Sequence, residues 1–444
     1  MKRITNLIAL VILLAAFTSA KAQATWNLQK CIDYAIQNNI QLKQQTLSSE
    51  YYNNQLGQAK YNRLPNLNAG FQNYNNFGRT LGSDNTYLNV NSNSTSGSLS
   101  TNVTLWSGFT LKNAIKVADM DLQASLQDMQ KAKDDMMLNI AAAYLETLFA
   151  DELLNVSQDL IKITQLQIDR TGKLVEAGSL AKGSLFEIEA QYAREELNVV
   201  NAQNRLQLAY LALYQLLELP STESFKIEKP VLPEIGANMS LINSMDVFKN
   251  AVQLKPAVKS AEFKLESAKN QLLIAKGNKM PSLSFGANYN NNYNYLMNSS
   301  LANIVFGEQL KSHQRYGFGL SLNIPIFNHY QAQTGVSNAQ IQLEVSELTL
   351  QNTKNLLRKD IEQAYTNALA AFKRYVANQK AVVSSTEAFR YTEEKFNVGM
   401  INSVEYNQSK NNLASAQSDL LQAKYEYIFR TKILDFYNGK TIEL

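Results

Sequence analysis

The sequence has few of the side chains on which most catalytic and metal sites depend. Its 444 residues include one cysteine, Cys31, and two histidines, His313 and His329. One cysteine cannot form an internal disulfide or a cysteine-based zinc site, and two histidines leave little material for a metal centre or an acid–base pair. The chain also lacks the G-x-S-x-G, H-E-x-x-H and phosphate-loop motifs. We therefore predict no enzyme activity, no catalytic residues, no metal and no cofactor.

Charge is scarce as well. The chain has 42 basic and 38 acidic residues, against 48 asparagines and 33 glutamines, so neutral amides are as common as charged groups. The first 22 residues carry three basic side chains and no acid, which leaves a formal charge of +1 for the remainder. A net charge this small gives no electrostatic reason to expect nucleic-acid binding. Its 45% hydrophobic content is too high for a disordered chain.

No hydrophobic run is long enough for a membrane-spanning helix. The apolar run at 7–17 has about half of the roughly 20 residues that a span needs. Lys2 and Arg3 precede it, and a small-residue A-x-A pattern ending at Ala22 follows it. This order predicts a secretory signal peptide over 1–22, with cleavage before Gln23. Cys31 lies nine residues beyond that cut and is therefore not a lipoprotein cysteine.

The chain contains the same unit twice. Residues 54–70 and 270–286 are identical at nine of seventeen aligned positions without a gap, and Ala143-Tyr144 matches Ala364-Tyr365. An internal repeat of this length points to a duplicated structural unit. The predicted organisation is a signal peptide at 1–22, a first repeat at 23–219, a linker at 220–240 and a second repeat at 241–444.

Each repeat predicts a very long helix. No proline occurs between Pro65 and Pro220 or after Pro325, and apolar residues follow steps of three and four along these stretches. We expect helices over 109–175 and 330–396, each of 67 residues and therefore roughly 100 Å long at 1.5 Å per residue. A shorter helix is expected to return beside each of them. Persistent stripes of this kind are typical of coiled-coil packing.

Four segments alternate with a period of two residues instead. Apolar and small or amide-bearing residues alternate near 66–72, 98–105, 282–289 and 316–326, with no charge among the polar partners. Uncharged alternation after a signal peptide is typical of outer-membrane β-strands. Four strands cannot seal a barrel in lipid, so three chains with twelve strands are expected. The stretches 73–95 and 290–314 are expected to be exposed loops.

Together these features resemble the TolC-type outer-membrane efflux proteins. Each repeat carries an x-Pro-x-Leu sequence before its first strand, Leu64–Leu67 or Met280–Leu283, and each long hairpin turns at a glycine, within Glu176–Leu180 or Asn397–Ile401. The resemblance implies a mainly α fold with membrane strands. Long helical hairpins would form a periplasmic α-barrel, and four strands per chain would contribute to a trimeric twelve-stranded β-barrel in the outer membrane.

The resemblance also implies a function. It predicts a homotrimeric channel-tunnel in outer-membrane lipid, serving as the passive exit duct of a tripartite efflux pump or a type I secretion system. A periplasmic adaptor, and through it an inner-membrane transporter, would be its partners. A porin-like or structural envelope protein would explain the strands but not two long hairpins. A periplasmic adaptor would need lipoyl-like modules that the sequence does not show.

Candidate site residues come from the same resemblance. Aligned on Gly399, the tyrosine and arginine that close the family's periplasmic entrance fall on Phe396 and Ile401, neither of which can form the same bonds. The family's two acidic ring positions fall on Glu405 and Gln408, so one acid remains. The hairpin tips that would contact an adaptor are Gly178, Ser179, Gly399 and Met400. Two alternatives stay open: the glycines can simply end helices, and Glu405 can be a solvated helix acid.

Overall fold

The computed structural model describes residues 25–81, 85–220, 225–231, 235–236, 242–297 and 303–442. The predicted signal peptide, its cleavage site and parts of the 220–240 linker lie outside these residues. The chain divides into two compact units: Met1–Thr46, Asp128–Val258 and Thr353–Leu444 in unit 1, and Leu47–Gln127 and Lys259–Asn352 in unit 2. Both units draw on both halves of the sequence. The predicted repeats at 23–219 and 241–444 therefore do not coincide with the two compact units, and their limits stay predictions.

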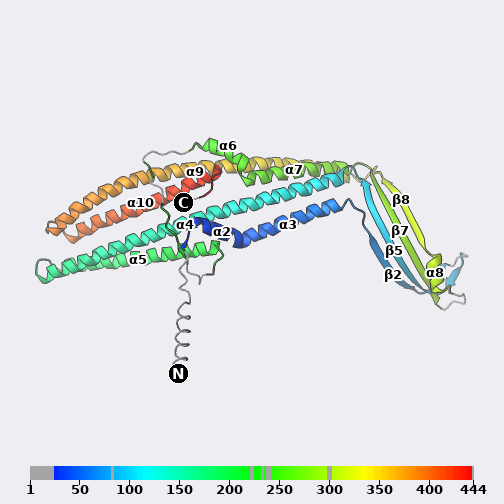
Figure 1. The fold of residues 1–444 in the computed structure, drawn as a ribbon, viewed down its shortest axis with the longest axis horizontal. Helices are drawn as coiled ribbons and strands as arrows, with labels where there is room; N and C mark the ends of the chain where they lie inside the picture. The colour runs from blue at the N-terminus through cyan, green and yellow to red at the C-terminus, as the bar shows by residue number, and fades with distance from the viewer. Residues whose placement is uncertain are drawn as a thin grey trace, which may run out of the picture. The chain divides into compact units, whose positions relative to one another are not determined.

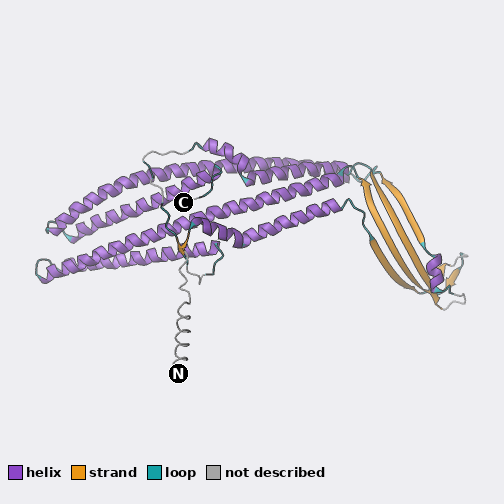
Figure 2. Ribbon diagram, viewed as in Figure 1, coloured by secondary structure: helices purple, strands orange, loops and turns teal. Residues whose placement is uncertain are grey.

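The duplication is visible in the helices (Figures 1 and 2). The four main helices of the first copy have 11, 22, 67 and 35 residues, and those of the second copy have the same lengths in the same order. They are α2 (Leu28–Asn38), α3 (Ile40–Tyr61), α4 (Thr110–Glu176) and α5 (Lys182–Leu216), then α6 (Ser244–Leu254), α7 (Pro256–Gly277), α9 (Gln331–Asn397) and α10 (Ser403–Tyr437). Both predicted 67-residue helices are confirmed to within one residue. Within the described ranges, no helix combines the length and the apolar character that a membrane crossing requires.

The short helices of each copy break at a side chain that reaches the return helix. Asn39 separates α2 from α3, and its Nδ2 donates to the backbone oxygen of Leu216 at 3.5 Å. Lys255 separates α6 from α7, and its Nζ donates to the backbone oxygen of Phe436 at 2.7 Å. The two copies thus use a neutral and a charged residue for the same structural task.

Unit 2 contains an antiparallel sheet of four strands in the order β2–β5–β7–β8. The strands are β2 (Asn68–Asn76), β5 (Asn91–Trp106), β7 (Ser282–Met297) and β8 (Arg315–Asn323), and a separate hairpin pairs β3 (Arg79–Leu81) with β4 (Tyr87–Asn89). The prediction that 73–95 and 290–314 are exposed loops is therefore partly wrong. Strand pairing continues through their Asn- and Ser-rich sequence, because ladder hydrogen bonds use only backbone groups. β8 ends two residues before Pro325, which has no N–H to donate.

Side-chain amides cover the free edge of β7 where it runs beyond β8. Gln309, on the short helix α8 (Phe306–Ser312), accepts the backbone N–H of Asn294 and donates to its carbonyl, both at 2.9 Å. Asn303 bonds the N–H and carbonyl of Leu296 in the same way, at 2.7 and 2.9 Å, and His313 donates through Nδ1 to one more β7 carbonyl. Each amide therefore satisfies the two backbone groups that a neighbouring strand residue would satisfy.

Unit 1 holds the main apolar core. Helices α2, α4, α5 and α10 meet there, and Cys31 is fully buried. The Tyr144 hydroxyl donates to the backbone oxygens of Trp26 and Glu228 at 3.1 and 2.7 Å. It thereby fixes the parallel pair formed by β1 (Thr25–Trp26) and β6 (Lys226–Ile227) to α4.

Candidate functional site

Each long hairpin of unit 1 turns at a glycine whose backbone is left-handed. Gly178 and Gly399 have φ values of 74° and 77°, a region that other residues rarely occupy. The next residue, Ser179 or Met400, donates its backbone N–H five residues back into the helix, at 2.8 or 2.9 Å. Both turns are thus Schellman-type helix endings. Met400 is 73% exposed, and adaptor contact by these four residues stays a prediction.

The four residues predicted at the entrance lie on different surfaces of the second hairpin. The Phe396 ring lies 4.7 Å from that of Tyr406, which is 3% exposed. Ile401 is half-buried in the turn. Glu405 and Gln408 are exposed, on the face of α10 opposite its buried residues. The structure therefore packs Phe396 inside the hairpin and leaves the two polar side chains free to face a neighbouring molecule.

Within the described part of the chain, Glu405 and Gln408 form hydrogen bonds only with residues of α10 and its N-terminal cap. The side chain of Asn402 caps the helix by accepting the Glu405 N–H at 2.9 Å, and a carboxylate in a first helical turn is stabilised by the helix dipole. Gln408 donates to Asn412, one turn further along, at 3.0 Å. These contacts fit both a solvated helix acid and a ring position.

Two polar links join the first-copy hairpin to the second-copy hairpin near their turns. Arg170 of α4 donates to the side-chain oxygen of Asn397 through Nη1, and to its backbone oxygen through Nη2 at 3.4 Å. Ser403 of α10 donates to the carboxylate of Glu187 of α5. These bonds connect the second-copy hairpin, where the entrance was predicted, to a fixed neighbour within the same chain.

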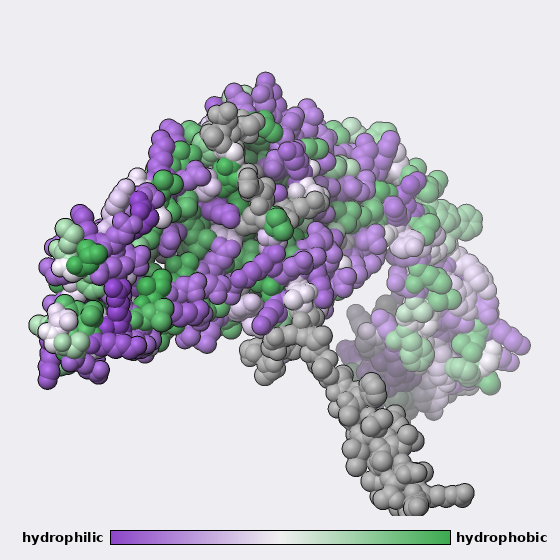
Figure 3. Space-filling model, turned by 60° about the vertical axis from the view of Figure 1, so that its left-hand side comes forward, coloured by the Kyte–Doolittle hydropathy of each residue, from purple (hydrophilic) through white to green (hydrophobic). Residues whose placement is uncertain are grey.

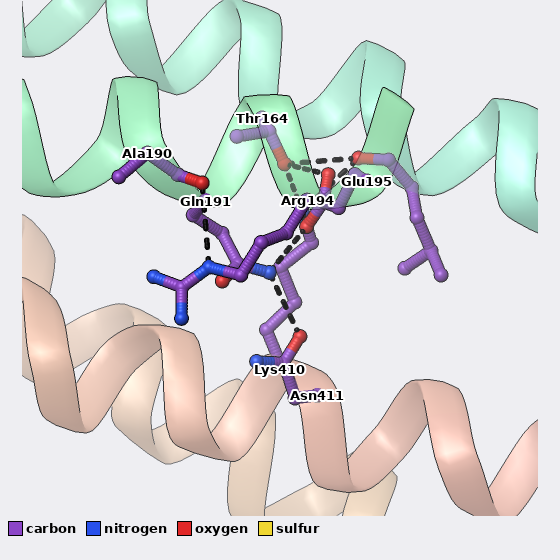
Figure 4. A network of polar contacts seen from close by, with 8 residues as sticks. Thr164, Ala190, Gln191, Arg194, Glu195, Lys410 and Asn411 are labelled. Carbon is purple, nitrogen blue, oxygen red and sulfur yellow. Dashed lines mark hydrogen bonds and ion pairs between the residues drawn. The ribbon is translucent and has the colours of Figure 1, made fainter. Parts of the chain in front are cut away.

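A buried ion pair joins the same two hairpins farther from the turns (Figure 4). Lys410 Nζ on α10 lies 3.0 Å from Glu195 Oε1 on α5, and the two side chains are 3% and 6% exposed. Lys410 also donates to the Thr164 hydroxyl and, at 3.0 Å, to the backbone oxygen of Leu160, both on α4. Gln191 donates to Glu195 at 3.0 Å. The ammonium group thus has three acceptors, and three helices meet at one fully bonded pair.

The burial of this pair determines how much it contributes to the stability of the fold. Burial lowers the pKa of Lys410, while the hydrogen bond and the charge of Glu195 raise it. A buried pair of this kind adds little net stability over a packed apolar pair, because both charges lose their hydration. Losing one partner is different, since it leaves an uncompensated charge in the interior. We therefore expect the pair to act mainly by fixing which positions of α4, α5 and α10 face one another.

Sequence inspection missed this network for a clear reason. Glu195 and Lys410 are 215 residues apart, and nothing in their local spacing connects them. The one local signal was Gln191 four residues before Glu195, which places both on one helix face. That spacing does not indicate which of the many glutamates and lysines on the helices pair with each other over long range.

One face of the unit 2 sheet is apolar over about half its length. On β8 this face carries Tyr316, Phe318, Leu320 and Leu322, and Phe318 is 83% exposed within the chain. The register places beside them Leu283, Phe285, Ala287 and Tyr289 of β7 and Leu99, Thr101 and Val103 of β5. From Tyr316 to Leu322 the strand spans about 20 Å, six steps of about 3.3 Å, which is most of the ~25 Å apolar band of outer-membrane strands. Such large exposed apolar groups require an apolar surrounding.

The opposite face, called the polar face below, carries the residues that alternate with them. On β5 every second residue from Ser92 to Ser100 is serine, and on β8 this face holds Gly317 and Gly319. In β2, β5, β7 and β8 the only charged side chain is Arg315, at the start of β8. Elsewhere, as Figure 3 shows, apolar residues also reach the surface between polar ones.

Comparison with known proteins shows the family. A family model described as outer membrane efflux protein matches residues 31–218 and again 247–435. The chain belongs to this family. The two matched ranges confirm the tandem duplication, and the family is one of transport proteins rather than enzymes. The protein is accordingly an outer-membrane protein whose helical part lies in the periplasm.

Individual relatives are similar over most of their length. TolC of Escherichia coli (strain K12) is 24% identical over 372 residues, 78% of this chain and 71% of the relative. Toxin and drug export protein A of Aggregatibacter actinomycetemcomitans is 22% identical over 344 residues, 75% and 70% of the two chains. A crystal structure of CusC matches with a TM-score of 0.78 at 18% identity, over 95% of this chain and 96% of that one. VceC of Vibrio cholerae matches with a TM-score of 0.78 at 16% identity, over 94% and 97%. These structures share the fold.

Proposed function

We propose that three copies of the chain form a passive duct that carries solutes or polypeptides out across the outer membrane. The four-stranded sheet carries the proposal. Its apolar face suits lipid, its polar face suits water, and its two outer strands, β2 and β8, need partners. Open strand edges are not tolerated in lipid, and the smallest outer-membrane barrels have about eight strands. Three copies supply an even twelve.

The helical part supports the same function. Two 67-residue helices with their return helices provide the walls of a periplasmic tunnel, which neither a porin nor an adaptor would need. The name of the Aggregatibacter relative describes toxin and drug export, which suits either an efflux pump or a type I secretion system. Energy would come from an inner-membrane transporter, reached through an adaptor at Gly178, Ser179, Gly399 and Met400.

We expect the detergent-solubilised protein to have three times the mass of the mature chain, measured by light scattering during gel filtration. Heating should open the shared barrel, so that the protein then migrates faster in the gel, as a monomer. Planar bilayers should show discrete channels from the trimer fraction alone. A monodisperse monomer that inserts and conducts would contradict the shared barrel.

We also expect Glu405→Gln to relieve channel block by trivalent cations. Three copies of Glu405 around the tunnel axis would concentrate negative potential in a narrow throat and attract multivalent cations. The mutation should raise the blocking concentration at least about tenfold, because three charges act on one ion, and should change resting conductance only slightly. Bilayer recordings with a trivalent hexammine complex measure both.

The matched control is Glu189→Gln, which removes an exposed acid from α5 of the first-copy hairpin. It should leave block unchanged, since the family places the constriction in the second-copy hairpin. Unchanged block in Glu405→Gln, with normal channels, would identify Glu405 as a helix-start acid and nothing more.

A further inference from the structure

The polar face of the sheet contains one isolated positive charge. Arg315 opens β8, pairs in register with Asn290, and is exposed. Its strand neighbour Tyr316 belongs to the apolar face, so Arg315 lies on the polar face at the level where the apolar band ends. It forms no ion pair within the described part of the chain.

The surroundings leave this guanidinium unneutralised. The nearest residues on its own strand and face are Gly317 and Gly319, and the space over Gly317 is taken by the amide of Asn288. Glu308 on α8 is the one described acid between 281 and 329. That helix contacts β7 through its edge and through Tyr293, whose ring lies 5.0 Å from Phe306 on the apolar side. Glu308 is exposed and forms no ion pair with Arg315 within the described residues.

We propose that Arg315 is a specificity-determining residue that makes the barrel end of the duct favour anionic solutes. This inference rests on the proposed function, because the trimer turns the polar face of each sheet toward the lumen and places three Arg315 side chains around one axis. The rest of that face is uncharged and consists mainly of serine, glycine and amide side chains, which bind no ion by charge. The three guanidinium groups thus set the sign of the potential at this end of the duct.

The range of this potential gives the inference a distinctive salt dependence. The Debye length is about 30 Å at 0.01 M salt but about 3 Å at 1 M. In a wide aqueous lumen, three wall charges therefore reach the permeating ion at low salt and are screened at high salt. An ion-selectivity effect that persisted unchanged at 1 M would have another origin.

The test is the reversal potential of single channels under a KCl gradient. Relative to the unmodified protein, Arg315→Gln should lower the chloride-to-potassium permeability ratio roughly twofold or more near 0.01 M salt, and by little near 1 M. Arg315→Lys keeps the charge and should retain the original ratio. Lys311→Gln removes an exposed cation from α8, off the polar face, and should leave the ratio unchanged.

Failure of this inference is distinguishable from failure of the proposed function. Normal channels with an unchanged ratio in Arg315→Gln would overturn the role of Arg315 and leave the duct intact. An equal shift in Lys311→Gln would also overturn it, because general surface charge would then explain the effect. Absence of channels from the unmodified trimer would instead overturn the duct itself.

Discussion

Replacing Lys410 with methionine should destabilise the helical unit by about 3–5 kcal/mol, because Glu195 would remain as a buried and unpaired carboxylate. Glu195→Leu alone should cost a similar amount, through the stranded ammonium of Lys410. The double variant should lose much less than the sum, since apolar side chains then fill a site whose charges contribute little net stability. Urea unfolding of the solubilised protein, followed by circular dichroism at 222 nm, measures the three values.

An exposed pair provides the control. Arg390→Ala removes contacts to Glu387 and Glu394 on the surface of α9 and should leave the free energy of unfolding nearly unchanged, because exposed ion pairs contribute little. If the double variant proved as unstable as the two single variants added together, the two side chains would act independently, and the network would not fix the helix register.

The second large effect is expected at the hairpin links near the turns. The double variant Arg170→Ala, Ser403→Ala removes the polar contacts to Asn397 and Glu187 that tie the second-copy hairpin to the first. These links are exposed or half-buried, so their loss should not unfold the protein. If they hold the entrance narrow at rest, single-channel conductance should rise several-fold, and intact cells should become sensitive to large antibiotics.

Lys162→Ala is the comparison variant. It removes a fully local pair with Asp159 on α4 and should leave conductance and sensitivity unchanged. Intact trimers of the double variant with unaltered conductance would show that these links do not restrain the entrance. The buried pair at Lys410 should remain formed in the double variant. Fast hydrogen exchange of the backbone amides around Lys410 would contradict this expectation.

The helices could be predicted well from the sequence and the strands less well. Proline-free stretches with steps of three and four residues set the limits of α4 and α9, and the repeat supplied an internal check. The strand pattern held only where apolar residues alternate with small ones. Beyond Tyr289 both faces of β7 carry asparagines, so no apolar–polar period marks the strand, although its backbone pairing with β5 continues.

The candidate site shows a different limit. Positions such as Glu405 were reachable because they lie a few residues from a recognisable glycine turn. Lys410, Glu195 and Thr164 were not, because their importance arises from burial at a junction of three helices. Each looks in sequence like an ordinary surface residue of a polar helix. The roles of Phe396, Ile401, Glu405 and Gln408 stay predictions.

The amide cover on β7 has a consequence for how chains come together after export. A strand edge in water recruits any other strand edge that meets it, and β7 extends well past its neighbour. Asn303 and Gln309 already bond the backbone N–H and carbonyl groups of Leu296 and Asn294. This stretch of β7 therefore cannot pair with a strand of another chain before the protein reaches the membrane. Lateral growth is then directed to β2 and β8, which lie at opposite sides of the sheet. In the proposed trimer, three subunits joined in this way would close on themselves, whereas an uncovered β7 would offer a third pairing edge and a route to aggregates.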